Sequence, residues 1–131
     1  MNAAAAVMTE PTVPVLVADD DYGVRTTVSL ILRRAGYDVH EARDGDEALE
    51  ILESQSIGVV LLDIRMPGRD GIAVLDAIDH PPTVLLISAF SVDPATRARI
   101  GSKVFRYLRK PVPPPQLLAV VEEAVTAASE T

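Results

Sequence analysis

Short apolar segments alternate with amphipathic segments along the whole chain. The apolar runs occupy residues 13–18, 37–42, 58–62, 84–87 and 104–108. The runs at 59–62 and 84–87 are continuously apolar rather than alternating, which is typical of strands covered by helices on both faces. We therefore predict five strands in a buried parallel sheet.

The segments between these runs have apolar residues at helical spacing. They occupy residues 24–35, 44–52, 72–78, 95–100 and 116–128. Gly36 is placed to end the first helix, and Asp93 with Pro94 forms a typical N-cap and first helical position for the fourth. Strands that alternate with helices imply right-handed crossovers and a parallel sheet. The pattern thus predicts an α/β fold, a three-layer α/β/α sandwich around a five-stranded sheet.

Length and composition fit a single folded domain. The 131 residues are enough for one core, and a hydrophobic fraction of 48% argues against disorder. We place the domain at residues 13–128, after a flexible N-terminal extension (1–12) and before a short C-terminal tail (129–131). The chain shows no internal repeat and no second-domain boundary.

Composition also excludes several classes of function. The absence of cysteine excludes a disulfide scaffold, a thiolate zinc site and a cysteine nucleophile. The formal net charge of -7 disfavours direct binding of nucleic acid, because cationic side chains carry most contacts to phosphate. No apolar run approaches the roughly 18 residues of a membrane helix, and residues 1–12 lack the features of a signal peptide. We expect a soluble cytoplasmic protein with no membrane contact.

Polar residues cluster where the apolar runs end. Asp19, Asp20 and Asp21 follow the first run, Asp63 follows the third, Ser88 the fourth and Lys110 the fifth. In an open parallel sheet, ligands bind outside the carboxyl ends of the strands. Each of these residues alone has an ordinary interpretation as a helix cap, a turn residue or a solvated strand end. Their placement at one edge of the sheet is what favours a functional site.

The residue types at this edge point to phosphoryl transfer. Adjacent carboxylates repel one another unless a cation neutralises them, and an all-oxygen ligand set suits Mg²⁺. A lysine supplies a positive charge for a phosphoryl group, and a serine hydroxyl supplies a hydrogen bond. A central carboxylate can itself act as the nucleophile and form an aspartyl-phosphate. Asp63 is the central candidate.

Four motifs, in order along the chain, resemble the receiver domain of bacterial two-component response regulators, the CheY-like family. They are VLVADDD at 15–21, LLDIRMPGRDG at 61–71, ISA at 87–89 and YLRKP at 107–111. The match covers roughly residues 14–128. The resemblance implies a doubly wound, flavodoxin-like sheet with strand order 2-1-3-4-5.

The resemblance also implies roles for the residues at the sheet edge. Asp63 would accept a phosphoryl group from a sensor histidine kinase or a histidine phosphotransfer protein. Mg²⁺ would be bound directly by Asp20 and Asp63, mainly through water by Asp19, and by the backbone carbonyl of Arg65. Lys110 would contact both the phosphoryl group and Asp63. Such a module is no turnover enzyme, apart from slow self-catalysed phosphorylation and dephosphorylation.

A switch mechanism follows from the same resemblance. Ser88 would move to bond the phosphoryl group, and Tyr107 would change rotamer to follow it. The change would reach the face built from the fourth helix, the fifth strand and the last helix, where a downstream target protein, a fused output domain or a second copy of the chain would bind. Six of the 12 basic residues lie at 97–110 on this side. They form either an ordinary solvated face or the partner surface.

Several positions depart from the family pattern or remain open. Asp21 either touches the metal or caps the first helix. The spacing of 25 positions between Asp63 and Ser88 is short, so we expect a turn near residues 79–82 to shorten the third helix. Arg65 and Phe90 stand two positions after Asp63 and Ser88, where the family tunes phosphoryl lifetime. Phe90 could cover the phosphoryl group, so we predict slow self-dephosphorylation.

Three other functions compete with this interpretation. A small Mg²⁺-dependent phosphatase with an aspartyl nucleophile usually has a second acid two residues later, where this chain has Arg65. A flavodoxin-like cofactor binder needs a Ser/Thr/Gly-rich phosphate loop after the first strand, which this sequence lacks. A receiver that is never phosphorylated fits poorly with the complete set of edge residues. Whether the chain acts alone or belongs to a longer protein stays open.

Overall fold

The five strands form one parallel sheet. The computed structural model describes residues 13–130, so the predicted N-terminal extension lies outside the described residues. The strands are β1 (Val15–Ala18), β2 (Val39–Ala42), β3 (Val59–Asp63), β4 (Thr83–Ser88) and β5 (Arg106–Arg109). Their order is β2-β1-β3-β4-β5, with every neighbouring pair parallel. This confirms the predicted doubly wound sheet.

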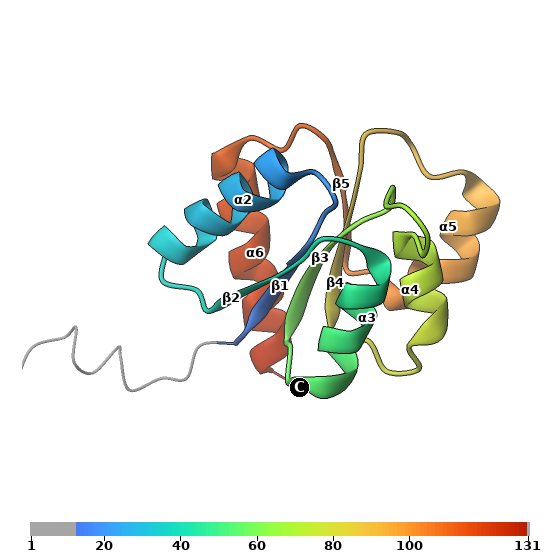
Figure 1. Ribbon diagram of the computed structural model, residues 1–131, viewed down its shortest axis with the longest axis horizontal. Coiled ribbons are helices and arrows are strands. Elements are labelled where there is room, and N and C mark those ends of the chain that lie inside the picture. The colour runs from blue at the N-terminus through green and yellow to red at the C-terminus, as the bar shows by residue number, and fades with distance from the viewer. Residues whose placement is uncertain (1–12, 131) are drawn as a thin grey trace, which may run out of the picture.

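Helices cover both faces of this sheet. They are α2 (Tyr22–Arg34), α3 (Gly45–Ser54), α4 (Gly71–Ala77), α5 (Pro94–Ile100), the short 3-10 helix η1 (Gly101–Lys103) and α6 (Pro114–Ser129). Figure 1 shows α2 and α6 on one face of the sheet and α3, α4 and α5 on the other. Within residues 13–130, none of the helices combines the length and the apolar character that a membrane span requires.

The apolar runs fill two cores, one on each side of the sheet. In β3, Val60 and Leu62 pack on the side of α3, α4 and α5, whereas Val59 and Leu61 pack on the side of α2 and α6. All four side chains are at most 1% exposed. Successive strand residues point to opposite faces, so a strand covered on both faces has to be apolar throughout. This is why the run at 59–62 does not alternate.

Aspartate caps begin four of the helices. Asp21, Asp44, Asp70 and Asp93 each accept a hydrogen bond from the backbone amide three residues later, at distances of 2.8–3.1 Å. Each such cap contributes about 1 kcal/mol to helix stability. At the other end of α2, Gly36 has a φ of 98°, a backbone conformation that favours glycine. The predicted end of the first helix before Gly36 and the predicted cap of the fourth helix are therefore confirmed, whereas the first helix begins at Tyr22, two residues earlier than predicted.

Helix α4 is short, as the spacing predicted. It has seven residues and ends at Ala77, before the loop at 78–82. The Lys103 ammonium donates to the backbone carbonyls of Leu75, at 2.7 Å, and Ile78, at 2.9 Å. Carbonyls at a helix C-terminus lack partners within the helix, so this distant lysine compensates for the early end of α4.

Several boundaries differ from the prediction by one or two residues, three of them at the last strand and the last helix. The chain forms η1 directly after α5, so β5 begins at Arg106 rather than at residue 104. Helix α6 begins at Pro114, two residues earlier than predicted, because proline is well suited to the first turn. The same helix continues to Ser129, so the first residue of the predicted tail is helical.

Candidate functional site

The carboxyl ends of four strands carry the polar residues of the candidate site. Asp19 directly follows β1, Asp63 ends β3, Ser88 ends β4 and Lys110 directly follows β5. Backbone hydrogen bonds continue the sheet beyond the strands: the amide of Asp19 donates to Ala42 at 3.0 Å, and that of Lys110 to Ser88 at 2.9 Å. The sheet itself therefore positions these side chains at one edge.

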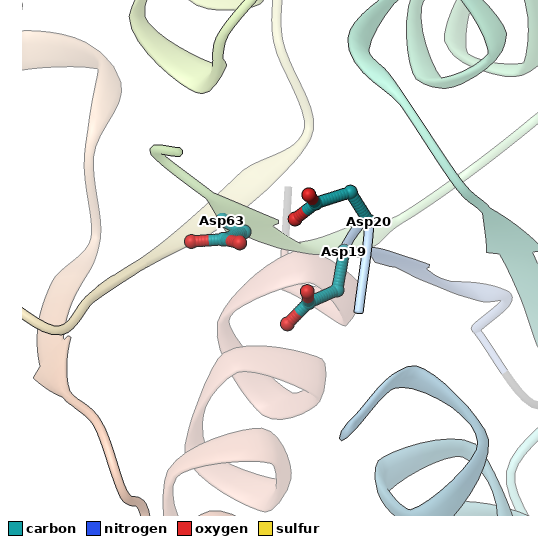
Figure 2. A group of neighbouring side chains, drawn as sticks. All are labelled: Asp19, Asp20 and Asp63. Atoms are coloured by element: carbon teal, nitrogen blue, oxygen red, sulfur yellow. The ribbon is translucent and has the colours of Figure 1, made fainter. Parts of the chain in front are cut away.

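Three carboxylates converge at this edge. Asp19, Asp20 and Asp63, which we call the acidic cluster, each offer an oxygen atom within 4.8 Å of the others. Figure 2 shows the three side chains at the adjoining ends of β1 and β3, with the carboxyl group of Asp20 pointing toward Asp63. Asp19 and Asp63 are 5% and 4% exposed, and Asp20 is exposed. The cluster is thus a set of hard oxygen ligands that solvent reaches mainly through Asp20.

Lys110 pairs with the two buried members of the cluster. Its ammonium lies 2.9 Å from Oδ2 of Asp19 and 3.3 Å from Oδ2 of Asp63. Burial opposes the charge of this ammonium, but the two carboxylates outweigh it, and the pKa of Lys110 lies above its ordinary value. Lys110 therefore remains charged and holds the two carboxylates side by side.

One lysine does not neutralise the cluster. Burial, followed by the charge of Asp19, raises the pKa of Asp63 to about 6, although Lys110 and the amide of Arg65 act in the opposite direction. A carboxyl group whose pKa is raised in this way carries its charge at an energetic cost. A divalent cation would remove that cost, so the chemistry of the donor set fits Mg²⁺.

The backbone around the buried carboxylates is tightly constrained. The amides of Asp21 and Arg65 donate to Oδ1 of Asp19, at 2.9 Å, and Oδ1 of Asp63, at 3.3 Å. The guanidinium of Arg25 donates to the carbonyl oxygen of Asp19 at 2.8 Å. A Cβ atom at Gly71 would lie 2.4 Å from the carbonyl oxygen of Asp63. Only glycine therefore allows α4 to begin this close to Asp63.

Asp21 and Asp20 have different surroundings. The Asp21 carboxylate accepts a hydrogen bond from the amide of Val24 at 2.9 Å, and Asp21 lies outside the acidic cluster. The capping interpretation of Asp21 is therefore confirmed. The Asp20 side chain makes no hydrogen bond or ion pair with any residue in the described range 13–130. Asp20 is consequently the member of the cluster whose oxygens are open to a ligand.

Neither Ser88 nor Tyr107 hydrogen-bonds to the acidic cluster within residues 13–130. The Ser88 hydroxyl accepts a hydrogen bond from the amide of Phe90 at 3.0 Å. The Tyr107 ring packs against the core on the side of α3, α4 and α5, and its hydroxyl is buried without a partner among residues 13–130. Both residues line the same cavity of about 200 Å³. Tyr107 and Ser88 are thus neighbours with free space between them.

Arg65 and Phe90 contact each other on the loops that follow β3 and β4. The guanidinium carbon of Arg65 lies 4.9 Å from the centroid of the Phe90 ring, within the range of a cation–π contact. Phe90 is 58% exposed, and Arg65 is also exposed. The two residues that follow Asp63 and Ser88 by two positions therefore contact each other across the two loops.

Most of the basic residues at 97–110 are engaged within the chain. Arg99 pairs with Asp76, Arg106 with Glu123, and Lys110 with the acidic cluster; Lys103 and Arg109 bond to backbone carbonyls. Arg97 instead stacks on the Tyr107 ring, with its guanidinium carbon 3.9 Å from the ring centroid. These contacts reduce the positive charge that the face offers to a partner. They favour the interpretation of residues 97–110 as an ordinary solvated face.

Sequence reasoning missed the structural contacts of three arginines. Arg25 holds the carbonyl of Asp19, Arg109 donates to the carbonyl of Ala89 and the hydroxyl of Ser91, and Arg97 covers Tyr107. The signal for Arg25 is its position one turn after the Asp21 cap, which directs it back toward the strand end. The other two arginines carry no comparable signal in the sequence.

A groove beside Lys110 makes the site accessible from the side of α2 and α6. Its volume is about 810 Å³, and its lining is mostly apolar, with Asp19, Asp63 and Lys110 at one end. The apolar lining includes Val24, Val28, Ile31, Val112 and Leu117. The buried carboxylates therefore border an open depression rather than a closed core.

Comparisons with known proteins agree with this geometry. The sequence profile of the response regulator receiver domain matches residues 15–122. The chain is 37% identical over 116 residues to the DNA-binding transcriptional regulator NtrC of Escherichia coli K12, covering 86% of this chain and 24% of NtrC. It is 36% identical to the transcriptional regulatory protein PdtaR of Mycobacterium tuberculosis, covering 86% of this chain and 56% of PdtaR. The chain thus spans between about a quarter and about half of these relatives.

Solved structures extend the similarity to three dimensions. A CheY-like receiver domain protein from Methanospirillum hungatei superposes with a TM-score of 0.83 at 22% identity, covering 92% of this chain and 98% of that one. The signal receiver domain of the response regulator NarL from Mycobacterium tuberculosis superposes with a TM-score of 0.77 at 33% identity, covering 89% and 98%. The first likeness supports the fold, and the second adds sequence similarity over a complete receiver domain.

Proposed function

The chain belongs to the response regulator receiver domain family of two-component systems, and from this membership we propose that it is a phosphorylation-controlled switch with Asp63 as the phosphoryl acceptor. The observation that carries the proposal is the acidic cluster, with Lys110 paired to both Asp19 and Asp63. These groups lie at the edge of a parallel sheet where ligands are generally bound.

The residues present fit a Mg²⁺ site. We assign Asp20, Asp63 and the backbone carbonyl of Arg65 as direct ligands and Asp19 as a ligand through water. Both oxygens of Asp19 accept hydrogen bonds at 2.9 Å, those of Asp63 accept longer ones at 3.3 Å, and Asp20 makes none within the described residues, which supports this division. Mg²⁺, when bound, would offset the negative charge of the cluster and of the incoming phosphoryl group.

The chemistry proposed for Asp63 needs a nucleophilic carboxylate and a phosphohistidine donor. An Oδ of Asp63 forms a bond to phosphorus while the N–P bond of the donor breaks, and the imidazole nitrogen keeps the electron pair. The pKa of about 6 leaves the Asp63 carboxyl mostly ionised at neutral pH, as a nucleophile requires. Lys110 lies within hydrogen-bond reach of Asp63 and balances charge on the transferred group.

The phosphoryl group would then bias the neighbouring loop. We propose that the Ser88 hydroxyl leaves the Phe90 amide to bond the phosphoryl group, and that the space this movement frees shifts the rotamer equilibrium of Tyr107 toward the position in which its ring packs against the core. The cavity shared by Ser88 and Tyr107 supports the proposal, because packed interiors without voids resist such movements. The result is a local charge event that changes the face of α5, β5 and α6.

The partners follow from the family. We propose a sensor histidine kinase or a histidine phosphotransfer protein as donor, and a downstream target protein or a fused output domain as receiver of the signal. A homodimer through α5, β5 and α6 is a further candidate; an unchanged molar mass with Mg²⁺ and beryllofluoride would rule it out. A phosphatase role is less consistent with Arg65, a basic side chain that rests on Phe90.

Amide NMR spectra with Mg²⁺, before and after addition of beryllofluoride, test the proposal. Beryllofluoride imitates a phosphoryl group on aspartate, so we expect shifts around Asp63, Ser88 and Tyr107. The same spectra of Asp63→Asn should not change on addition. A folded wild-type protein whose spectrum is indifferent to beryllofluoride would refute a function that operates through phosphorylation.

Phe90 is expected to prolong the lifetime of the phosphoryl group. Its exposed ring contacts Arg65, which follows Asp63 by two positions, and from there it would impede the attacking water. We expect Phe90→Ala to lose the phosphoryl group about threefold to tenfold faster, corresponding to about 1 kcal/mol of barrier. The decay is measured by following the phosphorylated protein after removal of the donor.

Leu30→Ala is the matched control for this measurement. Leu30 is also a large exposed apolar residue, 48% accessible, but it lies in the middle of α2. Its replacement should leave the decay rate unchanged. An equal or longer phosphoryl lifetime in Phe90→Ala would show that the ring does not shield the group.

A further inference from the structure

The Tyr107 ring occupies a position that its own hydroxyl does not favour. The ring packs against the apolar core that includes Leu86 and Ile100, a placement we call the inward position. Its hydroxyl is buried and has no hydrogen-bond partner among residues 13–130. Because burial of an unpaired hydroxyl is unfavourable, other contacts have to hold the ring there.

Arg97 supplies such a contact. Its guanidinium carbon lies 3.9 Å from the centroid of the Tyr107 ring, well inside the limit of about 6 Å for a cation–π interaction. The side chain of Arg97 makes no ion pair or hydrogen bond within the described part of the chain, unlike the other basic residues of this stretch: Arg99, Lys103, Arg106, Arg109 and Lys110. The stack on Tyr107 is therefore the interaction that fixes Arg97.

Arg97 and Tyr107 also border free space beside the loop that follows β4. Arg97 and Tyr107 line the cavity of about 200 Å³, together with Ser88 and Phe90. An outward turn of the ring would break the stack and enlarge this cavity. The contact between Arg97 and Tyr107 thus opposes one of the two ring positions and leaves the other unaffected.

We propose that Arg97 is a positioning residue that holds the Tyr107 ring in the inward position before any phosphoryl group is present. The consequence for signalling rests on the proposed function, in which Tyr107 moves with Ser88. A ligand that binds better when the ring is inward uses less of its binding free energy to shift the ring when the ring is already inward. Loss of Arg97 should therefore weaken the binding of a phosphoryl mimic, by no more than the factor by which it shifts the ring.

The ring position can be measured directly in the metal-free protein. The sequence has three tyrosines, so ¹³C-labelled tyrosine gives few ring signals to assign, and contacts from the Tyr107 ring to this apolar core report the inward population. We expect Arg97→Ala to lower the inward-to-outward ratio about twofold to fivefold, the range of an exposed cation–π contact. Arg97→Lys should retain part of the effect, since it keeps the cation.

Two further variants separate positioning from a general loss of charge. Arg99→Ala removes a positive charge from α5, the helix that also carries Arg97, and breaks the ion pair between Arg99 and Asp76. This variant should leave the ring inward. In a Tyr107→Leu background, Arg97→Ala should cause no further change in the affinity for beryllofluoride with Mg²⁺. Unchanged ring contacts in Arg97→Ala, or an equal loss in Arg99→Ala, would overturn the inference. Wild-type protein that fails to bind beryllofluoride would instead overturn the proposed function, while the metal-free ring comparison would remain valid.

Discussion

Replacing Asp63 with asparagine is expected to stabilise the metal-free protein at pH 7 by up to about 3 kcal/mol, although it removes the proposed phosphoryl acceptor. Burial and the charge of Asp19 raise the pKa of Asp63 from 3.8 to about 6 in the folded protein. The folded state therefore binds a proton more tightly than the unfolded state, and stability falls as the pH rises between these two values. Asparagine has no charge to bury.

The sign of this effect sets its pH window. The stabilisation that comes from keeping the Asp63 carboxyl group neutral is fully present below pH 3.8. This stabilisation is lost as the pH rises through about 6. The stability difference between Asp63→Asn and wild type should thus be absent in acid, grow through this window and level off above it. Urea unfolding followed by circular dichroism at a series of pH values, in the presence of a chelator, measures it.

Asp79→Asn serves as a charge-matched control, because Asp79 is an exposed residue in the loop after α4. Its effect should not vary across the same pH range. A difference between Asp63→Asn and wild type that is the same in acid and at neutral pH would contradict the assignment of the raised pKa to Asp63.

Removal of Lys110 is expected to damage both stability and phosphoryl transfer. Lys110→Ala leaves the buried carboxylates of Asp19 and Asp63 without their cation. Loss of one partner from such a group costs about 3–5 kcal/mol at pH 7, because uncompensated charge remains buried. The rate of phosphoryl acceptance should fall about a hundredfold or more, the typical effect of losing a group that stabilises transferred charge.

A double-mutant cycle separates these two effects. In the Asp63→Asn background only Asp19 remains for Lys110 to pair with, so Lys110→Ala should destabilise the protein less than it does in wild type. Mg²⁺ should restore part of the stability of the single variant Lys110→Ala, because it supplies the missing positive charge. Phosphoryl transfer at the wild-type rate in Lys110→Ala would contradict the role proposed for the ammonium.

The sheet and the positions of the site residues were predictable from the sequence because both depend on where strands end. The run at 59–62 is apolar throughout, so its covered faces and its end at Asp63 are visible without a structure. Parallel strands place all their carboxyl ends at one edge, and this alone brings Asp19, Asp63 and Lys110 together. No knowledge of side-chain contacts was required.

The contacts of the long side chains were not predictable in this way. Arg97 and Tyr107 lie on different elements, and the spacing of residues fixes the face of a helix but not the end point of a flexible arginine. Lys103 bonds to carbonyls of α4 that precede it by 28 and 25 positions, so the sequence around it holds no trace of the partner. The polar sites of a sheet edge follow from topology, whereas the contacts that tune them follow from packing.

The most direct test of the central claim is the mass of the intact protein after incubation with a phosphoryl donor and Mg²⁺. Phosphoramidate, which carries the N–P bond of a phosphohistidine, and a phosphorylated histidine phosphotransfer protein are the two donors to compare. Wild type should gain the mass of one phosphoryl group with at least one donor, and should gain none in the presence of a chelator. Asp63→Asn should gain none with either donor. Wild type that stays unmodified by both donors, or Asp63→Asn that is modified as readily as wild type, would contradict the proposal that Asp63 is the phosphoryl acceptor.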